Sequence, residues 1–315
     1  MTESSAVPKV NLQARRRRSP FVDVVIRLFR EKPWGVFGAF ITVILLLTGI
    51  FADLLAPYGY NDVHPADYLQ PSSAKYVLGT DNLGRDLLSR VIYGARISVI
   101  VGLAATSLSI VMATAIGTIS GYFGGVMDVV IQRFVDAWMC FPALVILIAV
   151  ISLTGPGLVQ MIVLLGILYG IGSSRIVRGA VMGIKRNIYI EAAKSTGCTS
   201  GKIMIRHILP NIMAPIIVIF TTQIAAVILS EASLSFLGLG IPPPAPSWGG
   251  MLSGTGRSYM FLAPWLAFWP GIALTVVVYG INMFGDALRD LLDPRLRGGV
   301  GRYELKSRKK PLKSV

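Results

Sequence analysis

The sequence predicts an all-α polytopic membrane protein with six transmembrane helices. The 315-residue chain is 53% hydrophobic and 15% charged, with a mean hydropathy of +0.65, whereas soluble domains are about 25% charged. It contains five uncharged runs that are long enough to cross a hydrocarbon core about 30 Å thick. Its basic residues flank these runs, so the formal net charge of +14 indicates contact with a lipid bilayer and not with nucleic acid.

The five runs contain six predicted spans. The third run is long enough for two helices, and Gly155-Pro156-Gly157 near its middle predicts a turn between them. These spans build a transmembrane domain over 34–290, with a polar loop at 178–210 on one side and loops at 56–96 and 232–265 on the other. The predicted spans are 34–55, 97–121, 137–154, 158–175, 212–231 and 266–286.

The Lys and Arg residues predict which side of the membrane each loop faces. With both termini in the cytoplasm, the cytoplasmic segments hold 25 of the 30 basic residues and the two long outer loops hold 5. The sequence therefore predicts a multi-pass protein of the cytoplasmic (inner) membrane, with both termini and the 178–210 loop inside the cell.

The segments outside the transmembrane domain are basic. Residues 1–33 comprise a tail with Arg15-Arg16-Arg17-Arg18 and then Phe21 to Arg30, a mixed apolar and basic stretch that predicts an amphipathic helix in the interface. The alternative is that this stretch extends the first span. The polar region before Trp34 is too long for the start of a cleavable signal. Residues 291–315 are predicted to form a basic cytoplasmic tail.

The spans carry almost no ionisable residue at depth, which argues against an ion-coupled transporter. The two cysteines and two histidines predict neither a disulfide framework nor a metal site, and the sequence has no H-E-x-x-H or G-x-S-x-G motif. We therefore expect no catalytic residue and no cofactor in this chain. Gly117 with Gly121, and Gly166 with Gly170, predict close helix contacts. The charged residues at 128, 133 and 136, and those at 286, 289, 290 and 293, are interpreted as ion-pair networks.

The stretch from Glu191 to Asn211 is unusually polar for its position between two apolar runs. Helix formers up to Thr196 followed by Gly197 predict a short helix that ends with a positive φ. A second short helix is predicted from Ser200 until Pro210 stops it. Ala192 and Ala193 leave a flat patch for another surface, although an ordinary solvated loop is the alternative. Gly197 to Ile203 misses the spacing of a phosphate-binding loop, so we expect no nucleotide here.

This stretch resembles the EAA loop of ABC-importer permeases. Glu191-Ala192-Ala193, Gly197 and Leu209-Pro210 match the pattern in sequence and spacing, and His207 departs from it where the family has Ile. In that family the loop forms a coupling helix that sits in a cleft of a cytoplasmic ATPase. The resemblance implies an ATPase-coupling role for Glu191, Ala192, Ala193, Gly197, Arg206, Leu209 and Pro210.

Three further segments resemble the C-type permeases of the dipeptide/oligopeptide branch: 78–90, 231–249 and 285–297. Arg85 with Asp81 or Asp86 predicts either a local ion pair or a substrate contact, and Trp248 is expected to anchor the second outer loop at headgroup level. The Gly- and Pro-rich part of that loop is interpreted as a gate or a binding-protein contact. The external loop or gate residues are expected to be Gly79, Asp81, Arg85, Asp86, Glu231 and Trp248.

The resemblance implies the MetI-like fold of a type I ABC importer permease. Such a subunit works with a homologous B-type permease, two cytoplasmic ABC ATPases and an extracytoplasmic binding protein, and ATP and Mg²⁺ are expected in the ATPases alone. The implied substrates are di- and oligopeptides. Nickel chelates, glutathione and oligosaccharides remain alternatives within the same branch, and an ion-coupled secondary transporter is the remote one.

Overall fold

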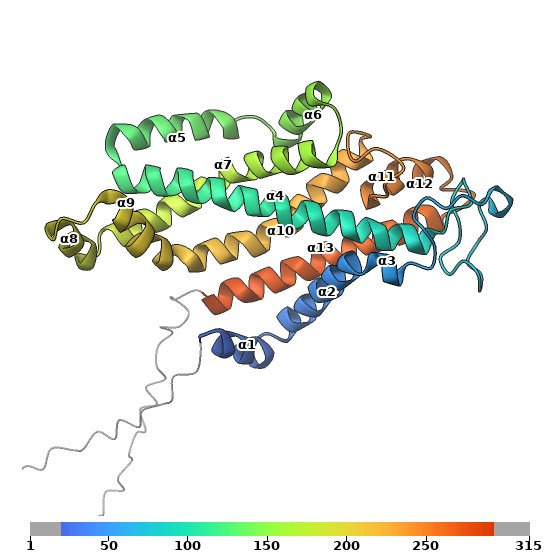
Figure 1. The fold of residues 1–315 in the computed structure, drawn as a ribbon, viewed down its shortest axis with the longest axis horizontal. Coiled ribbons are helices and arrows are strands. Elements are labelled where there is room, and N and C mark those ends of the chain that lie inside the picture. Colours follow the sequence, from blue (N-terminus) through green and yellow to red (C-terminus); the bar gives the residue numbers. More distant parts are fainter. Residues whose placement is uncertain (1–19, 293–315) are drawn as a thin grey trace, which may run out of the picture.

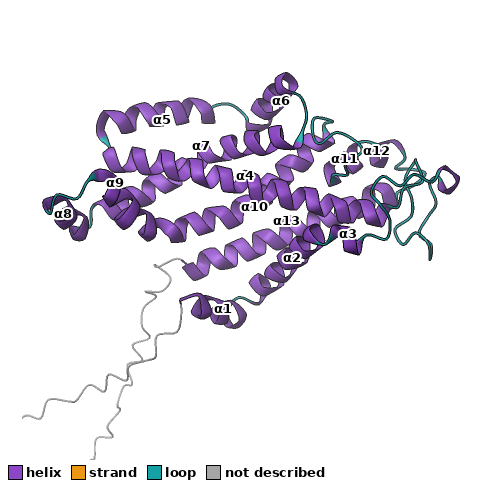
Figure 2. Ribbon diagram, in the orientation of Figure 1, coloured by secondary structure: helices purple, strands orange, loops and turns teal. Residues whose placement is uncertain are grey.

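The protein is described by a computed structural model, which places residues 20–292. This part of the chain is helical, with loops and no strand (Figures 1 and 2). The long helices run side by side along the long axis of an elongated bundle (Figure 1). The short helix α8 lies at one end, here called the α8 end, and α3, α11 and α12 lie at the other, here called the α11 end. The predicted tail at 1–19 and residues 293–315 of the tail predicted at 291–315, Asp293 among them, lie outside the described residues; Leu291 and Leu292 are helical.

Five helices in the described part of the chain are long and apolar enough to cross a membrane, or six spans if one bent pair counts as a span. Their apolar character makes lipid the favourable surrounding for the faces that they do not bury against one another. The five are α2 (Pro33–Ile50), α4 (Leu87–Phe123), α7 (Leu158–Lys185), α10 (Met213–Phe236, preceded by a helical segment from Ser200) and α13 (Trp265–Leu292).

The span expected at 137–154 is not one straight helix. Helix α5 (Gly125–Met139) and helix α6 (Ala143–Thr154) meet at an angle of 84°. The break falls at Cys140 to Pro142, because a proline disfavours the helical conformation of the residue before it and cannot donate a backbone hydrogen bond. At 12 residues, α6 is too short to cross a bilayer by itself.

Helix α4 is longer than its predicted span at both ends. Its 37 residues extend about 55 Å, and its first ten lie in what was predicted to be the outer loop 56–96. Asp86 starts the helix early, because its side chain accepts a hydrogen bond from Ser89 N at 2.7 Å. Helix α7 likewise continues to Lys185, into the predicted 178–210 loop.

Glycines allow α4 and α7 to pack closely, as their spacing predicted. A Cβ on Gly117 would lie 2.6 Å from the Ser174 carbonyl oxygen, and one on Gly166 would lie 2.6 Å from Leu108. Gly121 and Gly170 meet the partner helix in the same way. The two small-residue motifs thus serve one interface.

Helix α1 (Pro20–Glu31) is separate from α2, because Lys32 between them is not helical (φ −135°, ψ 71°). The predicted short helix is therefore confirmed, and the alternative of a simple extension is wrong. Leu28 on α1 is buried against Ala287 and Leu291 of α13, and Lys32 Nζ lies 2.5 Å from Asp290 Oδ2. Asp290, one of the residues of the ion-pair network predicted on α13, thus pairs with Lys32, which lies outside that network.

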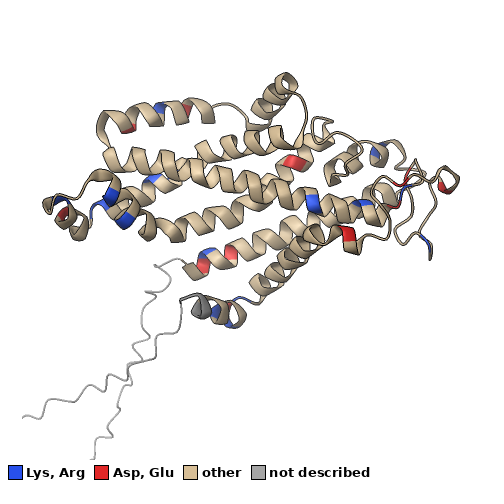
Figure 3. Cartoon of the chain, in the orientation of Figure 1, with Lys and Arg blue, Asp and Glu red and all other residues tan. Residues whose placement is uncertain are grey.

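Short elements complete the two ends. At the α11 end lie α3 (Ala52–Leu55), a 3₁₀ turn (Pro65–Asp67), α11 (Trp248–Ser253) and α12 (Thr255–Ser258); at the α8 end lie α8 (Ile188–Ser195) and α9 (Ser200–Ile203). Lys, Arg, Asp and Glu gather at these ends and on α5, and the helices between are almost free of them (Figure 3).

Candidate functional site

Helix α8 projects from the end of the bundle on two connections, from α7 and into α9 (Figure 1). It ends as its sequence predicted. Gly197 has φ +80°, a conformation that glycine adopts without the steric penalty of a side chain. Gly197 N donates to Lys194 O at 2.9 Å and Cys198 N to Ala193 O at 3.1 Å. These bonds turn the chain back toward the bundle directly after α8.

One face of α8 belongs to the hydrophobic core. Ile190 is fully buried, in a cluster that includes Val177 and Val181 of α7 and Ile203 of α9. Ala193, half-buried, packs against the same cluster. The predicted flat patch is therefore divided, with Ala193 turned to the bundle and Ala192 exposed.

The outer face of α8 carries the residues that are free to meet another molecule. Glu191, Ala192 and Gly197 are exposed, and the Glu191 carboxylate pairs with no residue in the described part of the chain. On α8, Ile188 is 83% exposed and Tyr189 is exposed as well. Ile205, in the π-helical turn Met204–Ile208 that follows α9, is 70% exposed. These three apolar side chains were missed by sequence reasoning, although the apolar Ile188-Tyr189-Ile190 directly before Glu191 was a signal. Exposed apolar residues gathered on a polar surface mark an interaction site.

The predicted second helix is only partly correct, because Pro210 does not stop it. After α9 the chain makes a π-helical turn (Met204–Ile208) and a 3₁₀ turn (Leu209–Ile212), and then enters α10. Proline has no N–H to donate, so the hydrogen-bond pattern changes around it: Leu209 N donates to Met204 O, five residues back. Leu209 packs on the core cluster, while Arg206 and Pro210 are exposed.

Tyr122, near the end of α4, links the base of α8 to the bundle. Its side chain is buried, and the ammonium groups of Lys185 on α7 and Lys194 on α8 each lie 5.7 Å from its ring centroid. Cations at this distance are attracted to the electron-rich face of an aromatic ring. Tyr122 thereby contacts both α7 and α8.

At the α11 end, the segment before α4 is a compact loop built on Asp81. The carboxylate of Asp81 accepts hydrogen bonds from Leu83 N at 2.8 Å and Arg85 N at 3.0 Å, and Arg85 Nε donates to its Oδ2 at 2.7 Å. Arg85 therefore pairs with Asp81, one of its two predicted partners. Its other predicted partner, Asp86, caps α4 instead. Gly79 has φ +85°, and a Cβ there would lie 2.7 Å from Gln70 O, so the loop fits only glycine at this position.

Two of the predicted external residues are internal. Glu231 was expected in the outer loop, but α10 continues to Phe236 and leaves Glu231 fully buried, where Ser235 Oγ donates to its Oε1 at 2.7 Å. Trp248 was expected at headgroup level, but it is 2% exposed and its Nε1 donates to Val91 O on α4 at 3.0 Å. Trp248 therefore joins α11 to α4 and does not anchor a loop in the bilayer.

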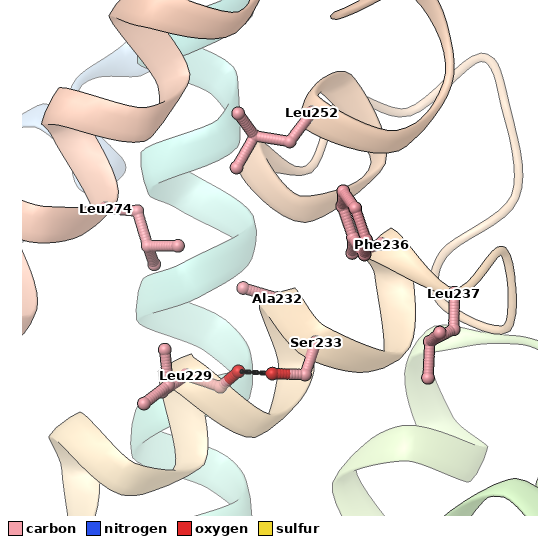
Figure 4. A pocket seen from close by; sticks show the side chains of 7 residues that line it. All are labelled: Leu229, Ala232, Ser233, Phe236, Leu237, Leu252 and Leu274. Atoms are coloured by element: carbon pink, nitrogen blue, oxygen red, sulfur yellow. Dashed lines mark hydrogen bonds between the residues drawn. The ribbon is translucent and has the colours of Figure 1, made fainter. Parts of the chain in front are cut away.

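The α11 end contains two pockets of different chemistry. The first, of 310 Å³, lies between α10, α11 and α13, and its lining is apolar apart from Ser233, which donates to Leu229 O of its own helix at 2.8 Å (Figure 4). The second, of 330 Å³, is lined by Arg85, Arg90, Ser235, Ser247 and Thr255 together with the 238–245 loop. Among the described residues, no group of three or more His, Cys, Asp or Glu could hold a metal ion.

The chain matches two family models. Residues 113–298 match the binding-protein-dependent transport system inner membrane component. Residues 19–71 match the N-terminal TM domain of oligopeptide transport permease C. The two models cover α1 and α2 and then the chain from within α4 onward, including α8.

Curated relatives are similar along almost the whole chain. The dipeptide transport system permease protein DppC of Alkalihalophilus pseudofirmus is 39% identical over 279 residues, covering 89% of this chain and 91% of the relative. The glutathione transport system permease protein GsiD of Pectobacterium atrosepticum is 38% identical over 282 residues, covering 89% and 93%.

A solved structure reported as inward facing conformations of the MetNI methionine ABC transporter has a chain similar in fold. The TM-score is 0.50 with 17% sequence identity, over 65% of this chain and 96% of that one. At this identity the likeness concerns the fold alone, and it bears out the expected MetI-like architecture.

Proposed function

Because the chain belongs to the family of binding-protein-dependent transport system inner membrane components, and is thus a permease subunit of an ABC importer, we propose that α8 is the helix through which an ATPase moves it. The observation that carries the proposal is the two-sidedness of α8. Ile190 is fully buried in the bundle core, whereas Ile188, Tyr189 and Glu191 are exposed on the outside. A surface of this kind binds a partner on one face and passes its displacement to the bundle on the other.

The α8 end faces the cytoplasm in this proposal. Lys and Arg favour the cytoplasmic side of short loops, and seven of them lie between Arg175 and Arg206. The ATPases would bind there, one of them against α8. ATP and Mg²⁺ belong to those subunits. The α11 end would then face outward and receive substrate from a binding protein.

The working unit is a pair of permeases with two ATPases. This chain supplies one half of the pathway and one coupling helix, and a homologous B-type permease supplies the other half. ATP binding closes the ATPase dimer, the two coupling helices move together, and the pathway changes from inward-facing to outward-facing. The chain itself makes and breaks no covalent bond.

Peptides are the proposed substrate. Support comes from the relatives named as dipeptide or peptide permeases, at 39% identity, and from the match to the oligopeptide permease C model. Glutathione is the second candidate, because a relative at 38% identity carries that name. Glutathione is itself a short peptide with free carboxylates, so both candidates share one ligand chemistry.

Affinity purification of the tagged chain from mild detergent tests the assembly. We expect a second permease and P-loop ATPases to be recovered with it. The ATPases should be lost in an Ile188→Asp, Ile205→Asp double variant, because docking would then bury two carboxylates without partners, which is costly. The matched control is Val126→Asp, which changes an exposed apolar residue of α5. Recovery of the chain alone, or equal loss in the control, would contradict the coupling role of α8.

Uptake by proteoliposomes containing the whole complex and its binding protein tests the substrate. ATP-dependent uptake of a labelled dipeptide, competed by other dipeptides more strongly than by glutathione, supports the peptide proposal. The opposite order of competition supports glutathione.

A further inference from the structure

We infer that the polar pocket at the α11 end binds the carboxylate group of a peptide. The arginine pocket, as it is called here, is the 330 Å³ cavity lined by Arg85, Arg90 and the 238–245 loop. The inference rests on the proposed function, because it names the chemical group of the transported substrate that this subunit holds.

Two cations and no anion line the arginine pocket. Its lining residues include Arg85 and Arg90, and none of them is Asp or Glu. Both guanidinium groups share one carboxylate outside the lining: Asp81 Oδ2 lies 2.7 Å from Arg85 Nε and 3.6 Å from Arg90 Nε. The nearby Asp86 carboxylate is engaged by Ser89 N and Oγ. The buried Glu231 carboxylate accepts a hydrogen bond from Ser235 and does not line the pocket either. The two guanidinium groups are therefore the charged groups that a ligand meets in the pocket.

The guanidinium groups keep donors for a ligand. Each guanidinium has five N–H donors in a planar fork. Arg85 donates from Nε to Asp81, and Arg90 donates from Nη1 to the Tyr60 carbonyl oxygen at 2.9 Å. Within residues 20–292, the two Nη atoms of Arg85 and the Nη2 atom of Arg90 donate to no protein atom.

These cations are also largely removed from water. The side chains of Arg85 and Arg90 are each 10% exposed. A desolvated cation gains more from an anionic partner than an exposed one does, because water no longer competes for its hydrogen bonds. The planar fork of arginine matches a carboxylate, which accepts two parallel hydrogen bonds from it.

The size and lining of the pocket suit the end of a small molecule. Its volume lies in the range of small-ligand sites, and Thr255 adds a hydroxyl group to the arginines. The lining residues Ser235 and Ser247 already bond to Glu231 and Gly250 N. An acidic side chain of the binding protein has the same chemistry. Because both guanidinium groups are buried, a ligand must be small enough to enter the pocket to reach them. A side chain on the surface of a binding protein meets this condition less well than a free peptide end does.

Protection of the arginines from phenylglyoxal tests the inference. The whole complex, without its binding protein, is labelled in nanodiscs, and modification of each arginine is followed by mass spectrometry. The probes are N-acetyl-dialanine and its C-terminal amide, which differ at the carboxylate. We expect saturable slowing of the labelling of Arg85 and Arg90 by the acid and not by the amide. Arg96, which pairs with the exposed Asp53, should be labelled equally in both cases.

Arg90→Gln provides the second measurement. Loss of one charge-assisted hydrogen bond should weaken protection of Arg85 by N-acetyl-dialanine about tenfold, and Arg96→Gln should not change it. If Arg90→Gln prevents assembly, the wild-type protection experiment still decides. Protection by acid and amide alike, protection that does not saturate, or protection that appears only with the binding protein would overturn the inference.

The inference and the proposed function fail in different ways. ATP-dependent peptide uptake without carboxylate-specific protection would leave the importer standing and remove the site. Carboxylate-specific protection without peptide uptake would leave the site and remove the proposed substrate.

Discussion

Asp128 on α5 accepts two hydrogen bonds from Arg178 on α7, from Nε at 2.6 Å and from Nη2 at 2.5 Å. Ser120 on α4 also donates to the Asp128 carboxylate, and Arg175 on α7 pairs with Asp136 on α5. Helix α5 is thereby tied to α7, the helix that leads into α8. The predicted pairing of Asp128 and Asp136 with Arg133 is correct only for Asp136, at 3.7 Å.

Arg178→Gln should destabilise the protein by about 2 kcal/mol, because it leaves a partly buried carboxylate without its two charge-assisted bonds. The measurement is the thermal inactivation midpoint of the purified complex in detergent. Arg133→Gln is the control, since that side chain is 80% exposed and exposed pairs contribute about 0–1 kcal/mol. Equal shifts for the two variants would show that the Asp128–Arg178 pair is not a structural link.

Gly197→Val should uncouple the importer without preventing its insertion in the membrane. A side chain at φ +80° is unfavourable by about 1–2 kcal/mol, although the surrounding space is open. The end of α8 should therefore change conformation. Substrate-stimulated ATPase activity of the reconstituted complex measures the effect. Gly201→Val adds the same side chain in open space without a positive φ and should remain coupled; the prediction is wrong if both variants behave alike.

Tyr122→Leu should loosen α8 from the bundle, and Tyr122→Phe should not. Each cation–π contact contributes about 0.5–1 kcal/mol, and phenylalanine keeps the ring that Lys185 and Lys194 face. Amide hydrogen exchange over 188–196 should become faster in the leucine variant alone. Faster exchange in both variants would assign the effect to the hydroxyl group and not to the ring.

Asp67→Asn should make Lys75 react faster with amine acylating reagents at pH 9–10. Lys75 Nζ lies 2.8 Å from Asp67 Oδ2, and this carboxylate raises the pKa of Lys75 above its usual value. The ion pair between Lys75 and Asp67 therefore persists as the pH rises, until the pH reaches the raised pKa of Lys75. Below that pKa, little of the Lys75 amine is in the neutral form that reacts. Without the carboxylate, the pKa falls toward its usual value and more neutral amine is present. The acylation rate of Lys75 relative to that of Lys202 is the readout, and an unchanged ratio would contradict the assignment.

The Gly197 and Tyr122 tests concern the α8 end and the Asp67 test concerns the loop before α4, so their effects should be independent. Tyr122 and Gly197 lie near α8, whereas Asp67 and Lys75 belong to the loop before α4. A loss of transport in all the variants together would indicate general unfolding, which the inactivation midpoint detects.

Local patterns predicted the α8 end well and the α11 end less well. Gly197 and the helix before it could be predicted because a helix and its terminating glycine depend on neighbouring residues. Glu231 and Trp248 could not, since their burial depends on α4 and α11, which lie far away in the sequence. The same holds for α4: hydropathy locates the membrane-crossing part of a helix but not the point where a polar helix end continues beyond it.

Pro210 and Pro142 show how far a local rule can be used. Pro210 was expected to end a helix, whereas no break was predicted at Pro142, and it is Pro142 that marks the break between α5 and α6. Around Pro210 the chain changes to π and 3₁₀ turns and stays helical. Ile208 and Ile212, on either side of it, are fully buried, so packing maintains the course of the chain there.

Helix α4 contains no proline along its 37 residues, and it carries Arg90 near one end and Tyr122 at the other. It packs against α7 along a seam from Gly166 and Leu108 to Gly121 and Arg178. Because a continuous helix transmits a displacement along its length, a shift of Tyr122 at the α8 end would reach Arg90 at the arginine pocket through α4 itself. One helix therefore connects the arginine pocket with the base of α8.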